Sequence, residues 1–131
     1  MSQPKLNDFC KEVFEANKIK GFDVSKENIG QTLMLVVSEL SEALEAHRKG
    51  YSANREFFDI EKETYSEFKP EYQRFKEAFE TNIKDTFEDE IADAAIRIFD
   101  LCGGLGIDID WHIKHKRRYN SLRPYKHGKA Y

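Results

Sequence analysis

The chain has 131 residues, with 40% hydrophobic and 34% charged side chains and only 7 glycines and 3 prolines, which favours one soluble, helix-rich domain and excludes two full-sized ones. Its longest aliphatic run, Leu33 to Val37, is far shorter than the roughly 20 residues of a membrane-spanning helix, and its two cysteines have no metal or redox spacing, so we expect a cytoplasmic protein. The formal net charge of −3 is uneven, because residues 111–131 carry seven basic and no acidic residues, which leaves 14 basic against 24 acidic residues, a charge of −10, in residues 1–110.

Two helices are predicted in the first 50 residues. Asn7 is a candidate cap for a helix that runs to about Lys18, before Gly21. A second helix runs from near Ser25 to Lys49, with Gly50 as its stop signal. Apolar residues recur along it at the spacing of one helical face, which predicts a buried stripe. This stripe consists of Leu33, Val37, Leu40 and Leu44.

Residues 51–84 are charged and carry eight aromatic side chains. We expect one or two helices there, the clearer from about Pro70 to Thr81. The next helix runs from about Asp85 to Cys102, and the pair Gly103-Gly104 is expected to end it. Its predicted apolar face consists of Phe87, Ile91, Ala94, Ile98 and Leu101.

A final helix is predicted from about Asp108 to Tyr119, and Arg123-Pro124 is expected to turn it into an extended tail. Nothing in the chain resembles a pattern rich in strands. The sequence therefore predicts an all-α fold, a helical bundle of about five helices in a single domain. That domain has an aromatic helical insertion at about 51–84 and a basic C-terminal tail at about 120–131.

Two acidic pairs stand out, Glu39 with Glu42 and Glu90 with Asp93. Residues three apart on a helix are neighbours, so each pair can present two carboxylates to one cation. Spacing alone is weak, since several other acidic pairs in the chain share it. The chosen pairs differ from the others in their position around the helix. Each of their members directly precedes a residue of a predicted apolar stripe or an alanine, so both pairs flank a stripe.

Carboxylates at the edge of a buried stripe repel each other unless a cation or protons neutralise them. Oxygen ligands without histidine or cysteine suit Mg²⁺, which usually keeps positions free for water and phosphates. A di-iron bundle is disfavoured, because no Glu-x-x-His occurs in the chain. An alternative stays open, in which the acids form surface salt bridges with Arg97, Arg48 or Lys49.

The run from Leu33 to Ala43, followed by the run from Glu88 to Asp93, resembles the ExxE…ExxD signature of MazG-like all-α nucleoside triphosphate pyrophosphohydrolases. Further on, Lys116-x-x-x-Asn120-x-x-Arg123 looks like the closing Lys and Asn motif of that family. The resemblance covers about residues 25–50 and 85–129. It implies Mg²⁺-dependent cleavage of a (deoxy)nucleoside triphosphate between the α and β phosphates, which yields a monophosphate and pyrophosphate, in a role such as cleaning of the nucleotide pool.

By matching positions, the resemblance implies roles for individual residues. The metal would be held by Glu39, Glu42, Glu90 and Asp93. Either Glu39 or Glu42 would act as the catalytic base, and the sequence does not choose between them. Substrate contacts would come from Arg97, Lys116, Asn120 and Arg123.

One departure from the family is the stretch of 47 residues between Glu42 and Glu90, which is longer than usual. Its aromatic side chains either stack on a base or form core and subunit interface. We expect a homo-oligomer, a dimer or a tetramer, that completes the core.

Two other functions stay open at this stage. In the first, the basic tail binds nucleic acid, which the charge of −10 on residues 1–110 disfavours. In the second, the chain is a non-enzymatic helical interaction module that uses the aromatic segment as its interface.

Overall fold

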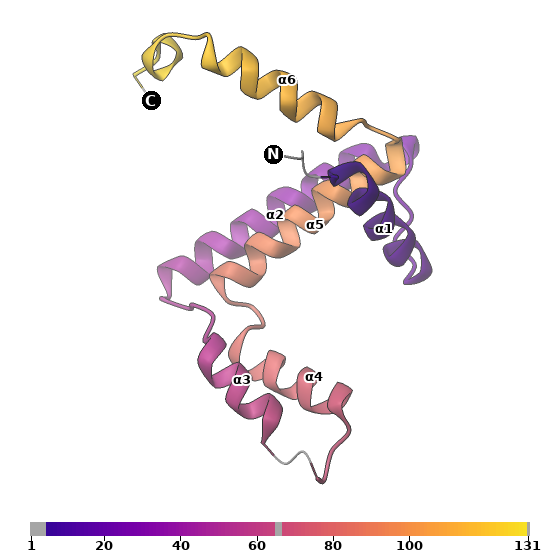
Figure 1. Ribbon diagram of the computed structural model, residues 1–131, viewed down its shortest axis with the longest axis vertical. Coiled ribbons are helices and arrows are strands. Elements are labelled where there is room, and N and C mark those ends of the chain that lie inside the picture. Colours follow the sequence, from indigo (N-terminus) through magenta and orange to yellow (C-terminus); the bar gives the residue numbers. More distant parts are fainter. Residues whose placement is uncertain (1–4, 65–66, 131) are drawn as a thin grey trace. The chain divides into compact units, whose positions relative to one another are not determined.

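The computed structural model describes residues 5–64 and 67–130, which form helices joined by turns and loops, with no strand among them (Figure 1). This confirms the predicted all-α class. None of the described helices is both long and apolar enough to span a membrane. The elements are α1 (Leu6–Ile19), η1 (Lys26–Asn28), α2 (Ile29–Arg48), α3 (Arg55–Glu63), α4 (Glu71–Asn82), α5 (Phe87–Leu105), α6 (Ile109–Ser121) and η2 (Tyr125–Gly128), where η is a 3-10 helix.

The chain divides into two compact units. The first comprises residues 1–29 and 98–131, and the second comprises residues 30–97. Both predicted acidic pairs belong to the second unit, together with α3 and α4. The predicted phosphate contacts on α6 belong to the first.

In the first unit, the start of α1 is stabilised from α6. The carboxylate of Asp110 accepts hydrogen bonds from the backbone N–H groups of Leu6 and Asn7, both at 3.0 Å. Asn7 is the second residue of α1 and not its cap. Its side-chain amide donates to Oδ1 of Asp108 at 2.8 Å. The prediction that Asn7 caps α1 is therefore wrong, because a carboxylate distant in sequence satisfies the first N–H groups instead.

The ends of α2 agree closely with the prediction. Ser25 and Asn28 form a capping box at the start of η1, which leads directly into α2: the Ser25 side chain accepts from the N–H of Glu27, and the N–H of Ser25 donates to the Asn28 side chain. The helix is followed by Gly50, whose φ of +73° favours glycine. Local side-chain chemistry thus sets both ends.

The predicted buried stripe of α2 is wrong. Leu33, Val37, Leu40 and Leu44 are 48 to 52% exposed in the single chain. The buried face lies roughly a quarter turn away, and it consists of Thr32, Val36, Glu39, Ala43 and Ala46. Most of these side chains are small, which allows another helix to approach closely, and the larger aliphatic residues are left on the neighbouring face. On α5 the predicted face is likewise divided, because Ala94 and Leu101 are buried while Phe87, Ile91 and Ile98 are about 40% exposed.

The aromatic insertion forms a helical hairpin, α3 and α4, which agrees with the prediction of one or two helices. Asn54 caps α3 by accepting from the N–H of Phe57 at 3.0 Å, and Pro70 precedes α4. The ring of Phe58 on α3 packs edge-on against Phe75 and Phe79 of α4, with centroid distances of 5.8 and 6.5 Å. Part of the aromatic content is therefore the core of this hairpin.

Gly103 and Gly104 do not end α5, which continues to Leu105 and is followed by Gly106 at a φ of +67°. A Cβ on Gly103 would lie 2.3 Å from the carbonyl oxygen of Cys10, and one on Gly104 would lie 2.9 Å from that of Val24. The glycine pair therefore permits close packing within the first unit. The predicted extended tail is also wrong in part, since it contains η2.

Candidate metal centre

The carboxylates of Glu39, Glu42 and Glu90 converge within the second unit. Each contributes an oxygen atom, and these atoms lie within 4.8 Å of one another. Glu39 and Glu42 come from adjacent turns of α2, and Glu90 comes from the first turn of α5. Glu90 is 4% exposed and Glu39 is 9% exposed, whereas Glu42 faces solvent. Three of the four predicted ligands are thus brought together.

Asp93, the fourth predicted ligand, lies three residues beyond Glu90 on α5 and is half-buried. It is not part of the group of three. Burial raises its pKa, and the charges of Asp89, Glu39 and Glu42 act in the same direction. These interactions place Asp93 in the electrostatic field of the cluster, at its α5 edge.

Arg97 is paired with Glu39. Its Nε donates to Oε1 of Glu39 at 2.8 Å, and the two side chains are 29% and 11% exposed. The salt-bridge alternative therefore applies to this one acid. A half-buried pair with this geometry orients Glu39 and neutralises one of the negative charges of the cluster.

Glu90 carries the strongest electrostatic perturbation. Burial, hydrogen bonding of the protonated form to Glu42 and Glu39, and repulsion from the neighbouring carboxylates together raise the pKa of its carboxyl to about 8. Burial also raises the pKa of Glu39, but the hydrogen bonds from Arg97, Glu90 and Glu42 outweigh it, so the pKa of Glu39 is lowered. In the absence of a cation, Glu90 thus holds a proton at neutral pH while Glu39 is ionised.

One oxygen of Glu90, Oε2, is fully buried and has no hydrogen-bond partner among the described residues. A buried polar atom without a partner is costly. A cation at this position would satisfy Oε2 and would replace the proton on Glu90. The donor set consists of carboxylate oxygens only, which fits a hard ion such as Mg²⁺ and not a soft metal.

Sequence reasoning missed two further acids at this centre. Asp85 and Asp89 form a second group with Glu90, again with oxygen atoms within 4.8 Å of one another. The N–H of Asp85 donates to Oδ2 of Asp89 at 3.0 Å. The acidic run from Glu88 to Glu90 is a signal for Asp89, but Asp85 precedes the helix and reaches the group only because the chain turns there with a φ of +65°.

The other predicted substrate contacts lie on and after α6, in the first unit. Lys116 is exposed, and its Nζ lies 5.2 Å from the ring centroid of Tyr119. The guanidinium carbon of Arg123 lies 5.6 Å from the centroid of the same Tyr119 ring. Oδ1 of Asn120 is buried and has no hydrogen-bond partner among the described residues. The side chains of Lys116 and Arg123 thus both make cation–π contacts with the ring of Tyr119.

Comparisons of the chain with models of protein families, with curated proteins and with solved structures gave no significant match.

Proposed function

We propose that the protein is a Mg²⁺-dependent nucleoside triphosphate pyrophosphohydrolase, which cleaves a (deoxy)nucleoside triphosphate to a monophosphate and pyrophosphate. The observation that carries this proposal is the buried carboxyl of Glu90, which meets Glu39 and Glu42 from a second helix and has an oxygen without a partner. The order of the acidic pairs, with Lys116 and Asn120 after them, supports it through the resemblance to MazG-like hydrolases.

The chemistry requires neutralisation of phosphate charge and a water molecule held in line with the leaving pyrophosphate. Bound Mg²⁺ would supply the first and would lower the pKa of a coordinated water. Glu39, Glu42, Glu90 and Asp93 would hold the ion, and binding requires that Glu90 lose its proton.

A carboxylate must also accept a proton from the attacking water. Glu39 already accepts a hydrogen bond from Arg97 at 2.8 Å, which lowers its basicity. Glu42 is exposed, and no ion pair with a basic side chain is found for it among the described residues. We therefore assign the base to Glu42 and the positioning of the cluster to the pair of Glu39 and Arg97.

The proposal assigns Lys116, Asn120 and Arg123 to the phosphates of the substrate. Lys116 and Asn120 are four residues apart on α6 and share one face of that helix. An ammonium and an amide can donate to the same phosphate group. The guanidinium of Arg123 follows directly after the helix and adds a second positive charge.

We also propose that the protein acts as a homo-oligomer, a dimer or a tetramer. Leu33, Val37, Leu40 and Leu44 form an aliphatic stripe on α2 that is about half exposed in the single chain. A continuous stripe of this kind is typical of a helix that packs against another helix. A second copy of the chain would cover it, which is the occupant that a symmetric assembly supplies.

The decisive experiment is an assay of the full chain with a panel of ribo- and deoxyribonucleoside triphosphates and Mg²⁺. We expect equal amounts of monophosphate and pyrophosphate, and no product with EDTA. Glu42→Gln should lower kcat at least 100-fold, because removal of a catalytic base typically costs 10² to 10⁴ in rate.

Glu45→Gln is the matched control, since Glu45 is also exposed and lies one turn further along α2, where it pairs with Lys49 at 3.4 Å. Its activity should stay within twofold of the wild type. Release of orthophosphate alone would contradict cleavage between the α and β phosphates. Activity of Glu42→Gln equal to that of Glu45→Gln would remove the acidic cluster from the mechanism.

A further inference from the structure

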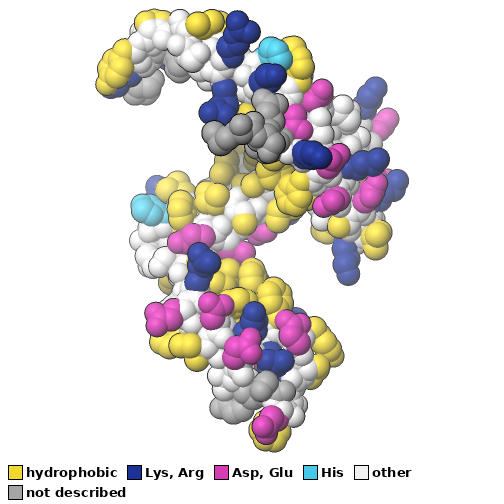
Figure 2. Space-filling model, in the orientation of Figure 1, with side chains coloured by type: hydrophobic (Ala, Val, Ile, Leu, Met, Phe, Trp, Pro, Cys, Tyr) yellow, Lys and Arg dark blue, Asp and Glu magenta, His cyan; other side chains and the backbone are white. Residues whose placement is uncertain are grey.

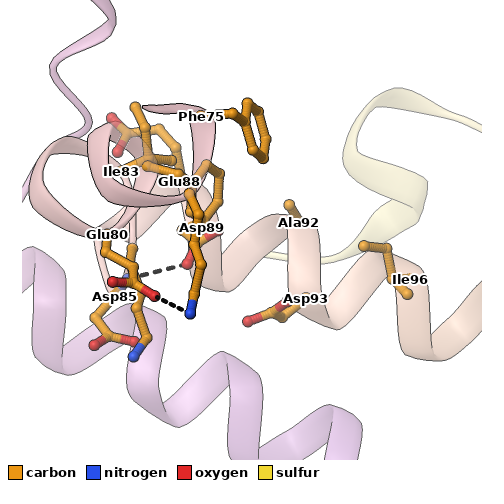
Figure 3. Close-up of a pocket in the computed structure, with 12 residues that line it drawn as sticks. Phe75, Glu80, Ile83, Asp85, Glu88, Asp89, Ala92, Asp93 and Ile96 are labelled. Atoms are coloured by element: carbon orange, nitrogen blue, oxygen red, sulfur yellow. Dashed lines mark hydrogen bonds and ion pairs between the residues drawn. The ribbon is translucent and has the colours of Figure 1, made fainter. Parts of the chain in front are cut away.

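A second feature of the same unit is a pocket of about 690 Å³ between α4 and α5, closed at one end by the chain that connects them (Figure 3). A volume of this size is in the usual range for small-molecule sites. Figure 3 shows Phe75 on the α4 side of the pocket and Ala92, Asp93 and Ile96 along α5. The α4 wall of the pocket belongs to the long segment between Glu42 and Glu90, by which this chain departs from the common MazG-like spacing.

The α4 wall of the pocket is aromatic and is supported from behind. The rings of Phe75 and Phe79 are stacked, with centroids 5.9 Å apart and an angle of 27° between planes. Phe58 packs edge-on against both from α3. Phe75 is nevertheless 46% exposed, so part of its ring surface is available, and Figure 2 shows apolar side chains gathered over α4.

The α5 wall joins the pocket to the metal centre. Asp93 and Asp89 line the pocket, and both also belong to the electrostatic surroundings of the carboxylate cluster. A ligand in the pocket would therefore end next to the predicted cation. Ala92 and Ile96 provide an apolar surface on the same helix, and Ile96 is 40% exposed.

The rim carries charges of both signs. Lys76 pairs with Glu80 at 3.9 Å across one turn of α4, and both line the pocket together with Lys84. An apolar ligand would make no use of these charged groups. A flat ring system with hydrogen-bond donors and acceptors would use the rim groups and the aromatic wall together.

We propose that this pocket binds the base and sugar of the nucleoside triphosphate, with the base against Phe75 and the phosphates directed past Asp93 to the carboxylate cluster. This inference rests on the proposed function and extends that function by assigning nucleoside recognition to the α4 insertion. Phe75 and Ile96 are the binding residues of this pocket, and neither takes part in the chemical step.

The test is a titration of the full chain, with labelled isoleucine methyl groups, followed by NMR. Four common nucleoside triphosphates and inorganic triphosphate serve as probes, in the presence of Ca²⁺ to slow turnover. Ile83 lines the pocket as Ile96 does. At least one nucleotide should shift the signals of Ile83 and Ile96, and inorganic triphosphate should not shift them. Phe75→Ala should weaken the binding of that nucleotide by about 5- to 100-fold, the range expected for loss of one aromatic stacking partner.

Tyr72→Ala is the matched control, because Tyr72 is an aromatic residue of α4 that is 72% exposed and does not line the pocket. Its affinity should stay within twofold of the wild type. Unshifted Ile83 and Ile96 signals with every nucleotide, or equal affinities for Phe75→Ala and Tyr72→Ala, would overturn the pocket assignment. Pyrophosphate release by the wild-type protein with Mg²⁺ is measured on the same preparation and reports separately on the proposed function.

Discussion

Replacing Glu90 by glutamine is expected to remove a pH dependence from the stability of the metal-free protein. The carboxyl of Glu90 has a pKa of about 8 in the folded protein, against 4.5 for an unperturbed glutamate. Between these two values the folded state holds a proton that the unfolded state has lost. The free energy of unfolding therefore falls as the pH rises through this window, because the native state binds more protons than the unfolded state.

The size of the effect follows from the same two pKa values. Each pH unit inside the window costs about 1.4 kcal/mol, so the interval from pH 4.5 to 8 has a limit of about 5 kcal/mol. Glu90 is 4% exposed, so solvent screens it little, but relaxation of the surrounding carboxylates lowers the cost. We expect a loss of about 2 to 4 kcal/mol in the wild type.

Other acids of the cluster do not obscure this slope. The pKa of Glu39 is lowered, so its contribution changes with pH only below the normal range of a glutamate. The pKa of Asp93 is raised, which gives a slope of the same sign at the acidic end of the window. Some dependence at the acidic end of the window should therefore persist in Glu90→Gln, while most of the loss towards pH 8 should disappear.

The assay is urea unfolding followed by circular dichroism at pH 5, 6, 7 and 8, with EDTA and at one protein concentration. Glu12→Gln is the control, because Glu12 belongs to an acidic pair of the same spacing on α1 and is exposed. It should keep the wild-type slope. A wild-type stability that is constant from pH 6 to 8, or an unchanged slope in Glu90→Gln, would refute the reasoning.

The same variant also tests the metal centre without an activity measurement. A ligand at 100 times its Kd stabilises the folded state by about 2.7 kcal/mol. Mg²⁺ should stabilise the wild type more at pH 8 than at pH 6, because it must displace the proton of Glu90. Glu90→Gln should lose most of this stabilisation, and Glu12→Gln should retain it.

Two further predictions concern packing. Gly103→Ala should destabilise the protein by about 2 kcal/mol or more in thermal or urea unfolding, since the new Cβ would lie 2.3 Å from the carbonyl oxygen of Cys10. Gly30→Ala on α2 meets nothing within 4 Å and should be neutral or stabilising by up to about 1 kcal/mol, and equal effects of the two variants would contradict the packing argument. Leu40→Glu should lower the assembly state in light scattering, because it introduces a charge into the exposed stripe, while Gln31→Glu on another side of α2 should leave the assembly unchanged. A wild-type protein that is monomeric at all concentrations would refute the proposed oligomer.

The helices themselves were predictable because their signals are local. The 3.6-residue periodicity of α2, the polar residues around Ser25, and Gly50 all act within a few residues of each other. Pro70 similarly indicated the start of α4. Asn7 is the exception among the caps, since the donors of α1 are satisfied by Asp110, more than 100 residues away.

The candidate site was predictable only in part. The acidic pairs were found by their phase on the helices, and the structure brings Glu39, Glu42 and Glu90 together. The prediction from position assumed that the apolar stripe of α2 is buried, and this assumption was wrong, because the stripe is about half exposed. Asp85 was missed because its approach to Glu90 depends on the backbone turn before α5, whereas Asp89 was missed although the acidic run from Glu88 to Glu90 is a signal for it.

The sequence by itself determined the all-α class, the approximate ends of most helices, and the two carboxylate pairs, because each depends on the order of neighbouring residues. The tertiary structure decided which face of α2 is buried, why Gly103 and Gly104 lie inside a helix, and which acid holds a proton. Burial and the pKa of Glu90 depend on side chains that approach from other helices. Such contacts are set by packing between distant segments, and the periodicity of a single helix does not specify them.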